Sequence, residues 1–171
     1  MWFKIIGSGL ILYATTSYGF RKAQEFQNRT IQLRYFQDAL AILQSEVTYG
    51  LTPLPLVMEK VSRVMKEPVA KFFEKVAQKL KQGEGEQLEI YWSNCLKEIN
   101  FSLTREDIAI LENLGFTLGR SSVMEQKKHL DLTIRQLQMA EKESRDLCAK
   151  NEKMWKYLGF FSGLALILVL I

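Results

Sequence analysis

The two ends of this 171-residue chain carry almost no charge, and this limits what the chain can fold into. Residues 157–171 hold no charged side chain, and residues 1–20 hold only Lys4. At about 1.5 Å per helical residue, an apolar helix that begins near Met154 approaches the ~30 Å thickness of the hydrocarbon core of a bilayer. We therefore expect a membrane-spanning helix at residues 153–171.

The N-terminal segment, residues 1–22, is less uniformly apolar, because serine and threonine residues dilute the run Ile5–Phe20. A cleaved secretory signal peptide also has a short apolar core, but it ends at a small-residue cleavage site of the A-x-A type. No good match to that pattern occurs near Ala14 to Gly19. We expect an uncleaved membrane span here, and a cleaved signal peptide stays open as the alternative.

Basic residues gather beside the two terminal segments. All 19 acidic residues lie within residues 23–152, whereas five of the 23 basic residues lie outside that range, so the middle region has a net charge of −1. Arg21 and Lys22 end the first segment, and Lys153 and Lys156 begin the second. Because basic flanks stay on the cytoplasmic side, we expect residues 23–152 to form a cytoplasmic domain, with both chain ends outside. A near-neutral domain also argues against a nucleic-acid partner.

The middle region shows helical periodicity. Apolar residues recur every seven positions from Phe26 to Val47, with further apolar residues between them, which predicts a long helix that continues from the first span. No segment shows the period-two alternation of a surface strand. Similar spacing predicts further helices that open near Thr52, Pro68, Glu86, Thr104 and Ser122. We expect an all-α fold, an antiparallel helical bundle of about six helices whose first and last helices continue into the terminal transmembrane spans.

Two of these helix starts carry the capping-box pattern, in which a Ser or Thr and an acidic residue three positions later satisfy each other's backbone N–H groups. Ser122 with Glu125 matches the full pattern, and Thr104 with Asp107 comes near to it. The sixth helix shows no stop signal before Met154. It should therefore run unbroken into the second span.

Gly50, Thr52, Pro53 and Pro55 separate the first two helices and predict a structural turn. We expect Gly50 to end the first helix in the left-handed conformation, and the prolines prevent its continuation. Thr52 would cap the second helix, with Pro53 in the first helical position, where a missing N–H costs nothing. Gly83-Glu84-Gly85 is expected to close the third helix with a flexible link.

Groups that could carry catalysis are sparse. The chain has a single histidine and no P-loop, nucleophile-elbow or zinc-protease motif. Cys95 and Cys148 each stand alone, so we expect two reduced, buried side chains rather than a zinc or redox site. We expect a protein that is not an enzyme and that holds no metal or cofactor. One alternative is histidine phosphotransfer through His129, although an ordinary surface histidine beside two lysines accounts for the same pattern.

A row of lysines is the best candidate for a partner-binding surface. Lys71, Lys75 and Lys79 lie four residues apart and share one helix face, where they could meet an acidic partner or anionic lipid headgroups. The preceding helix carries a similar set, Lys60, Arg63 and Lys66. An ordinary solvated face produces the same pattern, and neither cluster identifies a ligand.

Three segments carry a resemblance to a known family: Tyr49-Gly50-Leu51-Thr52-Pro53-Leu54-Pro55, Leu114-Gly115-Phe116-Thr117-Leu118-Gly119-Arg120-Ser121-Ser122, and Gln126-Lys127-Lys128-His129-Leu130. They look like the stage III sporulation protein AB family, whose cytoplasmic domain is similar to the F-type inner-membrane platform proteins of type II secretion and type IV pilus systems. The resemblance covers nearly the full chain. Family members often carry Ser-Asp where this chain has Ser121-Ser122, and we count both serines with the lysine row as candidate partner-binding residues.

The resemblance implies a non-enzymatic subunit of the channel that is assembled between mother cell and forespore during endospore formation. Such a subunit would lie in the mother-cell membrane around the forespore and dock its cytoplasmic helices on a companion secretion-type ATPase. Its spans would contact lipid and other membrane subunits, and self-association stays open. The alternative is a passive scaffold, which recruits partners without transmitting motion, because fold similarity does not by itself give function.

Overall fold

Helix follows helix along the described chain. The structure is a computed structural model. It describes the backbone of residues 2–50, 52–83, 88–119 and 122–170 and, among these, the side chains of residues 24, 27–50, 52–83, 88–119 and 122–150. Within those ranges there are six α-helices and no strand, so the prediction of an all-α protein with about six helices is confirmed.

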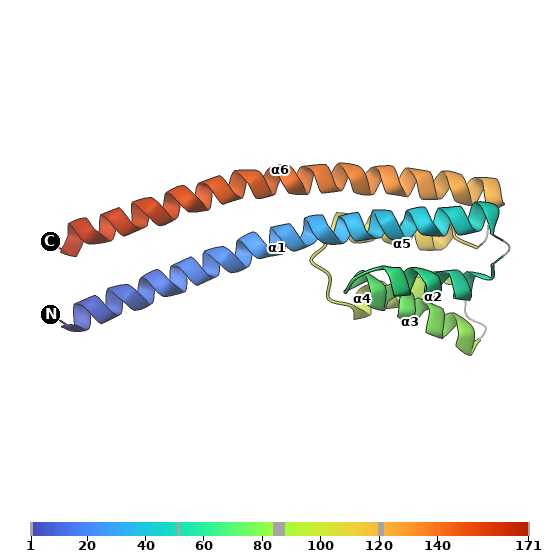
Figure 1. Ribbon diagram of the computed structural model, residues 1–171, viewed down its shortest axis with the longest axis horizontal. Coiled ribbons are helices and arrows are strands. Elements are labelled where there is room, and N and C mark those ends of the chain that lie inside the picture. The colour runs from blue at the N-terminus through green and yellow to red at the C-terminus, as the bar shows by residue number, and fades with distance from the viewer. Residues whose placement is uncertain (1, 51, 84–87, 120–121, 171) are drawn as a thin grey trace. The chain divides into compact units, whose positions relative to one another are not determined.

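Along the chain, the first and last helices are long and the four helices between them are short (Figure 1). The helices are α1 (Trp2–Tyr49), α2 (Leu54–Val64), α3 (Val69–Gln82), α4 (Leu88–Glu98), α5 (Arg105–Thr117) and α6 (Val123–Leu170). The chain divides into two compact units, one of residues 29–142 and one of residues 1–28 with 143–171. We call residues 29–142 the bundle. It contains α2 to α5, the last part of α1 and the first part of α6.

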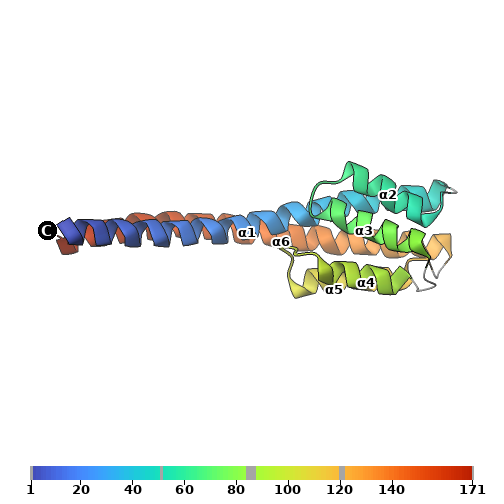
Figure 2. The same cartoon turned by 90° about the horizontal axis from the view of Figure 1, so that it is seen from below.

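Within the bundle, the short helices pack against one another in chain order. α2 packs on α3, α3 contacts α4, and α4 packs on α5. Figures 1 and 2 show these four helices lying lengthwise beside the bundle parts of α1 and α6, which run in opposite directions. Every short helix therefore has a neighbour against which it can bury its apolar stripe.

α1 faces the bundle core with one stripe of side chains. The stripe follows the predicted seven-residue spacing and is fully buried at Leu33, Phe36, Leu40 and Leu43. The predicted seam is thus confirmed where side chains are described. α6 contributes Leu130 and Leu137 to the same core.

Four phenylalanines and a tryptophan meet at the centre of the bundle. The ring centroids of Phe72 and Trp92 lie 4.7 Å apart, edge to face, and Phe73 lies 5.1 Å from Phe72. Phe36 of α1 lies 5.4 Å from Phe101, which precedes α5. Aromatic pairs in such geometry add about 0.5–1.5 kcal/mol beyond the burial of their area. Phe72 and Phe73 are both fully buried.

Trp92 determines how closely α4 approaches α5. Its indole N–H donates a hydrogen bond to the carbonyl oxygen of Leu111 over 2.8 Å. A Cβ atom placed on Gly115 would lie 2.5 Å from Cδ1 of Trp92, which is closer than real Cβ contacts. The Leu114-Gly115 step in one of the family-like segments therefore has a packing role, because only glycine leaves the space that the indole occupies.

Gly50 ends α1 for a different reason from the one predicted. Among the described glycines, the left-handed conformation occurs at Gly83 and Gly119, so the left-handed prediction for Gly50 is wrong. The N–H of Gly50 donates to the carbonyl oxygen of Glu46 over 2.8 Å, and a Cβ on Gly50 would lie 2.7 Å from that same oxygen. Glycine is needed at this position for space rather than for its backbone angles.

The predicted cap of α2 is also corrected. α2 begins at Leu54, so Pro53 itself takes the cap position and no side chain caps the helix. The Thr52 hydroxyl donates instead to the Glu46 carboxylate over 3.3 Å. A carboxylate is a strong acceptor, and its position beside the turn draws the hydroxyl away from the helix end. Pro55 lies in the first turn of α2, where a missing N–H costs nothing.

The remaining helix boundaries that are described follow the predicted signals. Gly83 ends α3 in the left-handed conformation, with φ of 66°. Thr104 and Asp107 form a complete capping box at the start of α5. Ser122 and Glu125 exchange the same two hydrogen bonds at the start of α6.

The predicted membrane spans lie at the two ends of the chain, in α1 and α6. Among the residues that the structure describes with side chains, no helix is both long enough and apolar enough to cross a bilayer. The predicted spans, residues 1–22 and 153–171, lie outside the described side chains, and Glu84 and Gly85 of the predicted link lie outside the described residues altogether. The spans therefore stay predictions.

Candidate functional site

The lysine row on α3 is largely engaged within the protein. Lys75 and Lys79 each bind one oxygen of the Glu98 carboxylate on α4, at 2.8 Å in both cases. Hydrogen bonds from these two lysines lower the pKa of Glu98 to about 2. Lys71 is exposed and takes no part in these two contacts. Two of the three predicted partner-binding lysines thus join α3 to α4.

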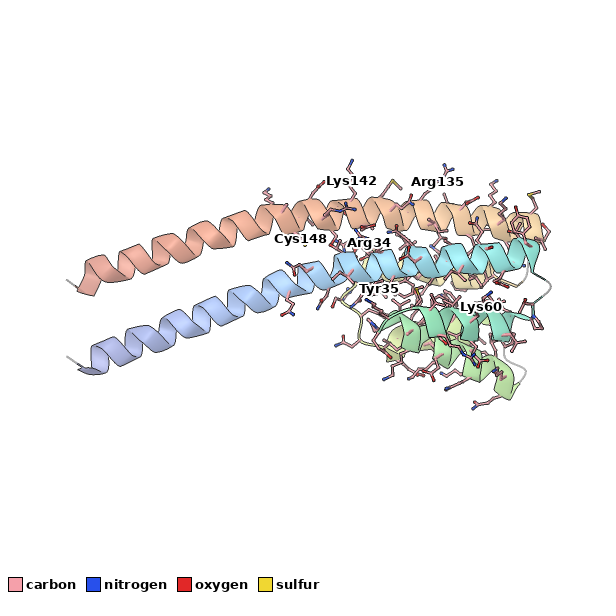
Figure 3. The ribbon with its side chains drawn as sticks, in the orientation of Figure 1. Arg34, Tyr35, Lys60, Arg135, Lys142 and Cys148 are labelled. Atoms are coloured by element: carbon pink, nitrogen blue, oxygen red, sulfur yellow. The ribbon has the colours of Figure 1, made fainter. Side chains whose placement is uncertain are left out.

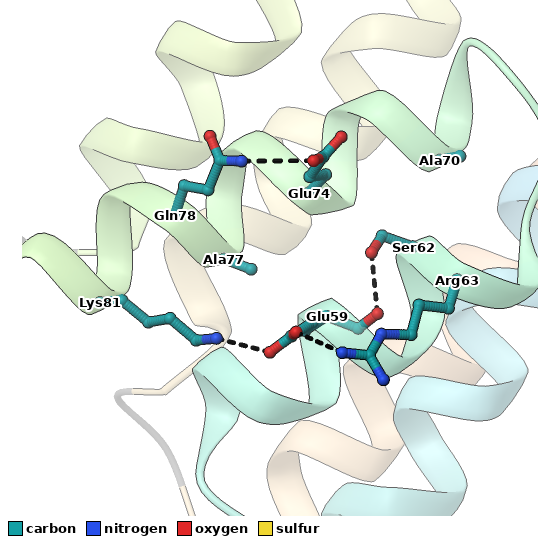
Figure 4. Close-up of a pocket in the computed structure, with 8 residues that line it drawn as sticks. All are labelled: Glu59, Ser62, Arg63, Ala70, Glu74, Ala77, Gln78 and Lys81. Carbon is teal, nitrogen blue, oxygen red and sulfur yellow. Dashed lines mark hydrogen bonds and ion pairs between the residues drawn. The ribbon is translucent and has the colours of Figure 1, made fainter.

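A second group of charges surrounds a pocket of about 430 Å³ between α2 and α3 (Figure 4). Its central acid is Glu59, which binds Lys81 of α3 and, at 2.6 Å, Arg63 of its own helix. The hydrogen bonds from Lys81 and Arg63 lower the pKa of Glu59. Elsewhere on the rim, Gln78 donates to Glu74 over 3.3 Å. Glu59, Arg63 and Lys81 therefore already bind one another, and Glu74 already accepts from Gln78.

The predicted basic set on α2 does not form one surface. Lys60, labelled in Figure 3, forms an ion pair with Glu46 near the end of α1, and its hydrogen bond lowers the pKa of that carboxyl. Arg63 turns to Glu59, and Lys66 lies exposed beyond the end of α2. The contact between Lys60 and Glu46 belongs to the α1–α2 turn, where Glu46 also accepts from Thr52.

A buried ion pair between α1 and α5 was not foreseen from the sequence. The Arg29 guanidinium donates twice to Asp107, from Nε to Oδ2 over 2.8 Å and from Nη2 to Oδ1 over 3.0 Å. The Asp107 side chain is 1% exposed and that of Arg29 is 11% exposed. Burial raises the pKa of Asp107, but hydrogen bonds from Arg29 and from the backbone N–H of Thr104 outweigh it, so the net shift is downward. Asp107 therefore caps α5 and also holds α5 to α1.

A neighbouring contact holds the segment between α4 and α5 against α1. The side-chain oxygen of Gln32 accepts a hydrogen bond from the backbone N–H of Ser102 over 2.8 Å, and Gln32 is nearly buried. Phe101, the preceding residue, packs its ring on Phe36 of α1. Together with Arg29 and Asp107, these contacts fix the path of the chain into α5.

Polar side chains also join α1 to α6 within the bundle. Glu141 of α6 accepts from Nη2 of Arg34 over 2.8 Å and from Gln37 over 2.9 Å, and its side chain is nearly buried. The hydrogen bond to Glu141 raises the pKa of Arg34, which Figure 3 labels on α1. Further along the pair of helices, Gln44 donates to Asp131 over 2.7 Å. No spacing pattern in the sequence pointed to these contacts.

The other residues named from the sequence lie apart from one another. Ser122 caps α6, and Ser121 lies outside the described residues. His129 is partly exposed on α6. Cys95 is buried, and burial raises the pKa of its thiol, whereas Cys148 is partly exposed, so the expected burial of Cys148 is wrong. Among the residues with described side chains, no three acidic, histidine or cysteine residues are grouped to hold a metal ion.

Three comparisons with known proteins point to one family. A family model described as stage III sporulation protein AB matches residues 4–171. The stage III sporulation protein AB of Bacillus subtilis (strain 168) is 34% identical over 169 residues, with 98% of this chain and 98% of that relative covered. A solved structure of a stage III sporulation protein AB has 27% sequence identity and a TM-score of 0.68, and the match covers 71% of this chain and 97% of the solved one.

Proposed function

Because the chain belongs to the stage III sporulation protein AB family, we propose that it serves endospore formation as a non-enzymatic platform subunit of a membrane complex. In this proposal residues 1–22 and 153–171 span the mother-cell membrane around the forespore, and the bundle faces the cytoplasm. The bundle couples a companion secretion-type ATPase to other membrane subunits, which the spans contact.

The ion pairs that the carboxylates form between helices support the proposal that the protein is not an enzyme. Glu59 joins α2 to α3, Glu98 joins α4 to α3, Asp107 joins α5 to α1, and Glu141 joins α6 to α1. The pKa values of Glu59, Glu98 and Asp107 are lowered by their partners. A general acid or base works best with a pKa near the operating pH. These carboxylates act as bridges between helices, which suits a protein that grips neighbours.

The two long helices support a mechanical role. α1 and α6 are each a single helix of 48 residues, and each contributes both to the bundle and to one predicted span. Within the bundle, Arg34 and Gln37 tie α1 to Glu141 of α6. A helix without a flexible joint passes on a push or a rotation, whereas a linker absorbs it.

An insertion after Lys150 tests whether motion is transmitted. A glycine-rich insert of about seven residues adds a flexible joint, whereas a helix-forming insert of the same length keeps α6 continuous and close to its original register. We expect the glycine variant to reach the membrane and to keep its helix content but to give a low spore yield. The helix-forming control should sporulate almost normally. A normal spore yield from the glycine variant would contradict force transmission and favour a passive scaffold.

Crosslinking in sporulating cells tests the ATPase partner. Lysine-reactive crosslinks mapped by mass spectrometry should join the α3 lysines to a secretion-type ATPase. Since Lys75 and Lys79 already bind Glu98, we expect most of these crosslinks at Lys71. Absence of any crosslink to an ATPase would contradict the coupling of the bundle to an ATPase and would favour the passive scaffold.

A further inference from the structure

One face of α6 within the bundle takes part in none of the contacts described above. It consists of six residues, which we call the α6 stripe: Met124, Lys128, Leu132, Arg135, Met139 and Lys142. At 3.6 residues per turn these residues lie within about 80° of arc and extend over about 27 Å. The arc lies opposite the buried positions Leu130, Thr133 and Leu137. Between the first and last members, no other residue falls within it.

The apolar members of the α6 stripe are exposed. Met124 is 76% exposed, Leu132 54% and Met139 66%. Single exposed apolar side chains are common on protein surfaces and need no explanation. These three lie within the same arc of one helix, and cations alternate with them along the helix axis.

The cations of the stripe differ from most other basic side chains of the bundle. Among the bundle residues with described side chains, eight basic residues form ion pairs, namely Arg29, Arg34, Lys60, Arg63, Lys75, Lys79, Lys81 and Lys97. Lys128, Arg135 and Lys142 form no ion pair with any residue whose side chain is described. Figure 3 shows Arg135 and Lys142 projecting from α6 on the side away from α1. Asp131, which lies between Lys128 and Arg135 in sequence, binds Gln44 instead.

We propose that the α6 stripe docks a helix of a partner protein, one that carries acidic side chains beside a narrow apolar seam. Lys128, Arg135 and Lys142 repeat every seven residues, and so do Leu132 and Met139. Two helices stay in contact along a left-handed coiled coil at that repeat. Methionine adapts its shape to different apolar partners, and the row of cations selects for acidic ones.

Two other occupants fit the stripe less well. A second copy of this chain docked through the same stripe would set three cations against three cations, and opposed like charges cost free energy. A lipid surface takes up a helix through a broad apolar face, whereas this stripe is narrow and has no aromatic side chain. The proposal goes beyond the proposed function, because it assigns a surface and a partner chemistry whichever complex the protein serves.

Peptide binding to the full-length protein in detergent micelles tests the proposal without a spore assay. The probe is a helical peptide with leucine at its a and d positions and glutamate at e and g, and a second peptide replaces each glutamate with lysine. We expect the acidic peptide to bind at least about tenfold more tightly than the basic one, and added salt to weaken its binding. Equal binding of the two peptides, or binding of neither, would overturn the proposal.

Charge reversal locates the binding face. In the variant Lys128→Glu, Arg135→Glu, Lys142→Glu, we expect the acidic peptide to bind about tenfold or more weakly and the basic peptide to gain affinity. The control, Lys66→Glu, Lys97→Glu, Arg105→Glu, makes the same change of net charge at exposed cations elsewhere on the bundle. It should stay within about twofold of the wild type. Equal loss in the two variants would show a net-charge effect and overturn the proposal.

Replacement of the apolar members removes contacts while it keeps the charge. Leu132→Ser with Met139→Ser should weaken binding of the acidic peptide about tenfold, with an unchanged salt dependence. Circular dichroism confirms that each variant keeps its helices. Unchanged binding in this variant would mean that only the cations of the stripe bind the peptide, and it would contradict the proposal of a docked helix.

Photo-crosslinking in sporulating cells identifies the occupant. A photoreactive residue at Leu132 is compared with one at Val64, which is 61% exposed on α2. We expect crosslinks from residue 132, and not from residue 64, to a peptide of another protein that mass spectrometry shows to be acidic and to have heptad apolar spacing. Crosslinks to lipid, to a second copy, or to nothing would each overturn the proposal.

Discussion

α1 contacts the rest of the bundle through two chemically different sides. Towards the short helices it buries apolar side chains around Phe36, over which the aromatic rings of α3 and α4 close. On this side its polar contacts, from Arg29 and Gln32, lie at the N-terminal end of its bundle part. Towards α6 it presents Arg34, Gln37 and Gln44, which bind carboxylates of that helix. Apolar contacts tolerate small shifts along a helix, but a hydrogen bond needs its distance and angle. The difference teaches that the aromatic side supplies most of the stability, whereas the polar side specifies how α6 lies along α1.

Truncation on the aromatic side should have the largest effect. Phe72→Ala removes a fully buried ring that contacts Phe36, Phe73 and Trp92, and we expect a loss of about 3–5 kcal/mol in the free energy of unfolding. Urea denaturation of the full-length protein in detergent, followed by circular dichroism, measures it. Phe116→Ala, at a half-exposed position of α5, is the control and should lie within about 0.5 kcal/mol of the wild type. Similar losses in both variants would remove the special role of the aromatic cluster.

Loss of the buried ion pair should have the second-largest effect. It tests whether a polar contact can contribute as much to the free energy of unfolding as the apolar contacts do. Asp107→Asn leaves the Arg29 charge buried without its carboxylate, and we expect a loss of about 3 kcal/mol. The double variant Arg29→Met, Asp107→Asn removes both charges, keeps a side-chain acceptor for the Thr104 N–H, and should recover much of that loss. The same denaturation measurement checks both variants. A double variant as unstable as the single one would show that the pair is itself stabilising.

A smaller effect is expected on the polar side. Glu141→Gln keeps the shape of the side chain but removes the charge that binds Arg34, so the loss should be about 1 kcal/mol. Hydrogen exchange followed by mass spectrometry should rise in residues 123–142 and change little in α3. The matched control is Glu143→Gln, an exposed glutamate two residues away. Faster exchange in α3 than in α6 would contradict the division between the two sides.

The exposed bridge at Glu98 should contribute least to stability, because exposed ion pairs are weak. Its pKa is lowered to about 2, so its contribution is present above the ordinary carboxyl pKa of about 4.3 and is lost as pH falls towards 2. Replacement of Lys75 and Lys79 with Met should return the pKa of Glu98 to about 4.3. A carboxyl titration followed by nuclear magnetic resonance measures this. An unchanged pKa would mean that the two lysines are not its cause.

Local patterns predicted much of the fold. The seven-residue seam of α1, the capping boxes of α5 and α6 and the glycine that ends α3 each depend on residues within one or two helical turns. α4 was expected to begin near Glu86, and the described helix begins at Leu88. Charge patterns within one helix were less informative. They predicted a lysine surface on α3, but Lys75 and Lys79 bind a carboxylate on the next helix instead.

Contacts between residues far apart in the chain could not be predicted from the sequence. Arg29 and Asp107 lie 78 positions apart, and Arg34 and Glu141 lie 107 apart. The residues around Asp107 predict that it caps α5, but they do not predict that it also binds Arg29. The need for glycine at position 115 is equally non-local, because it arises from the indole of Trp92 on another helix.

By itself, the sequence determined that this chain is helical, where most of its helices begin and end, and which side of α1 is apolar, because helix capping and hydrophobic periodicity act over a few residues. Only the tertiary structure decided which charges pair, why Gly50 and Gly115 are glycines, and which cations on α6 stay outside the bundle contacts. Those outcomes depend on distances across helices, and no spacing along a single chain contains them.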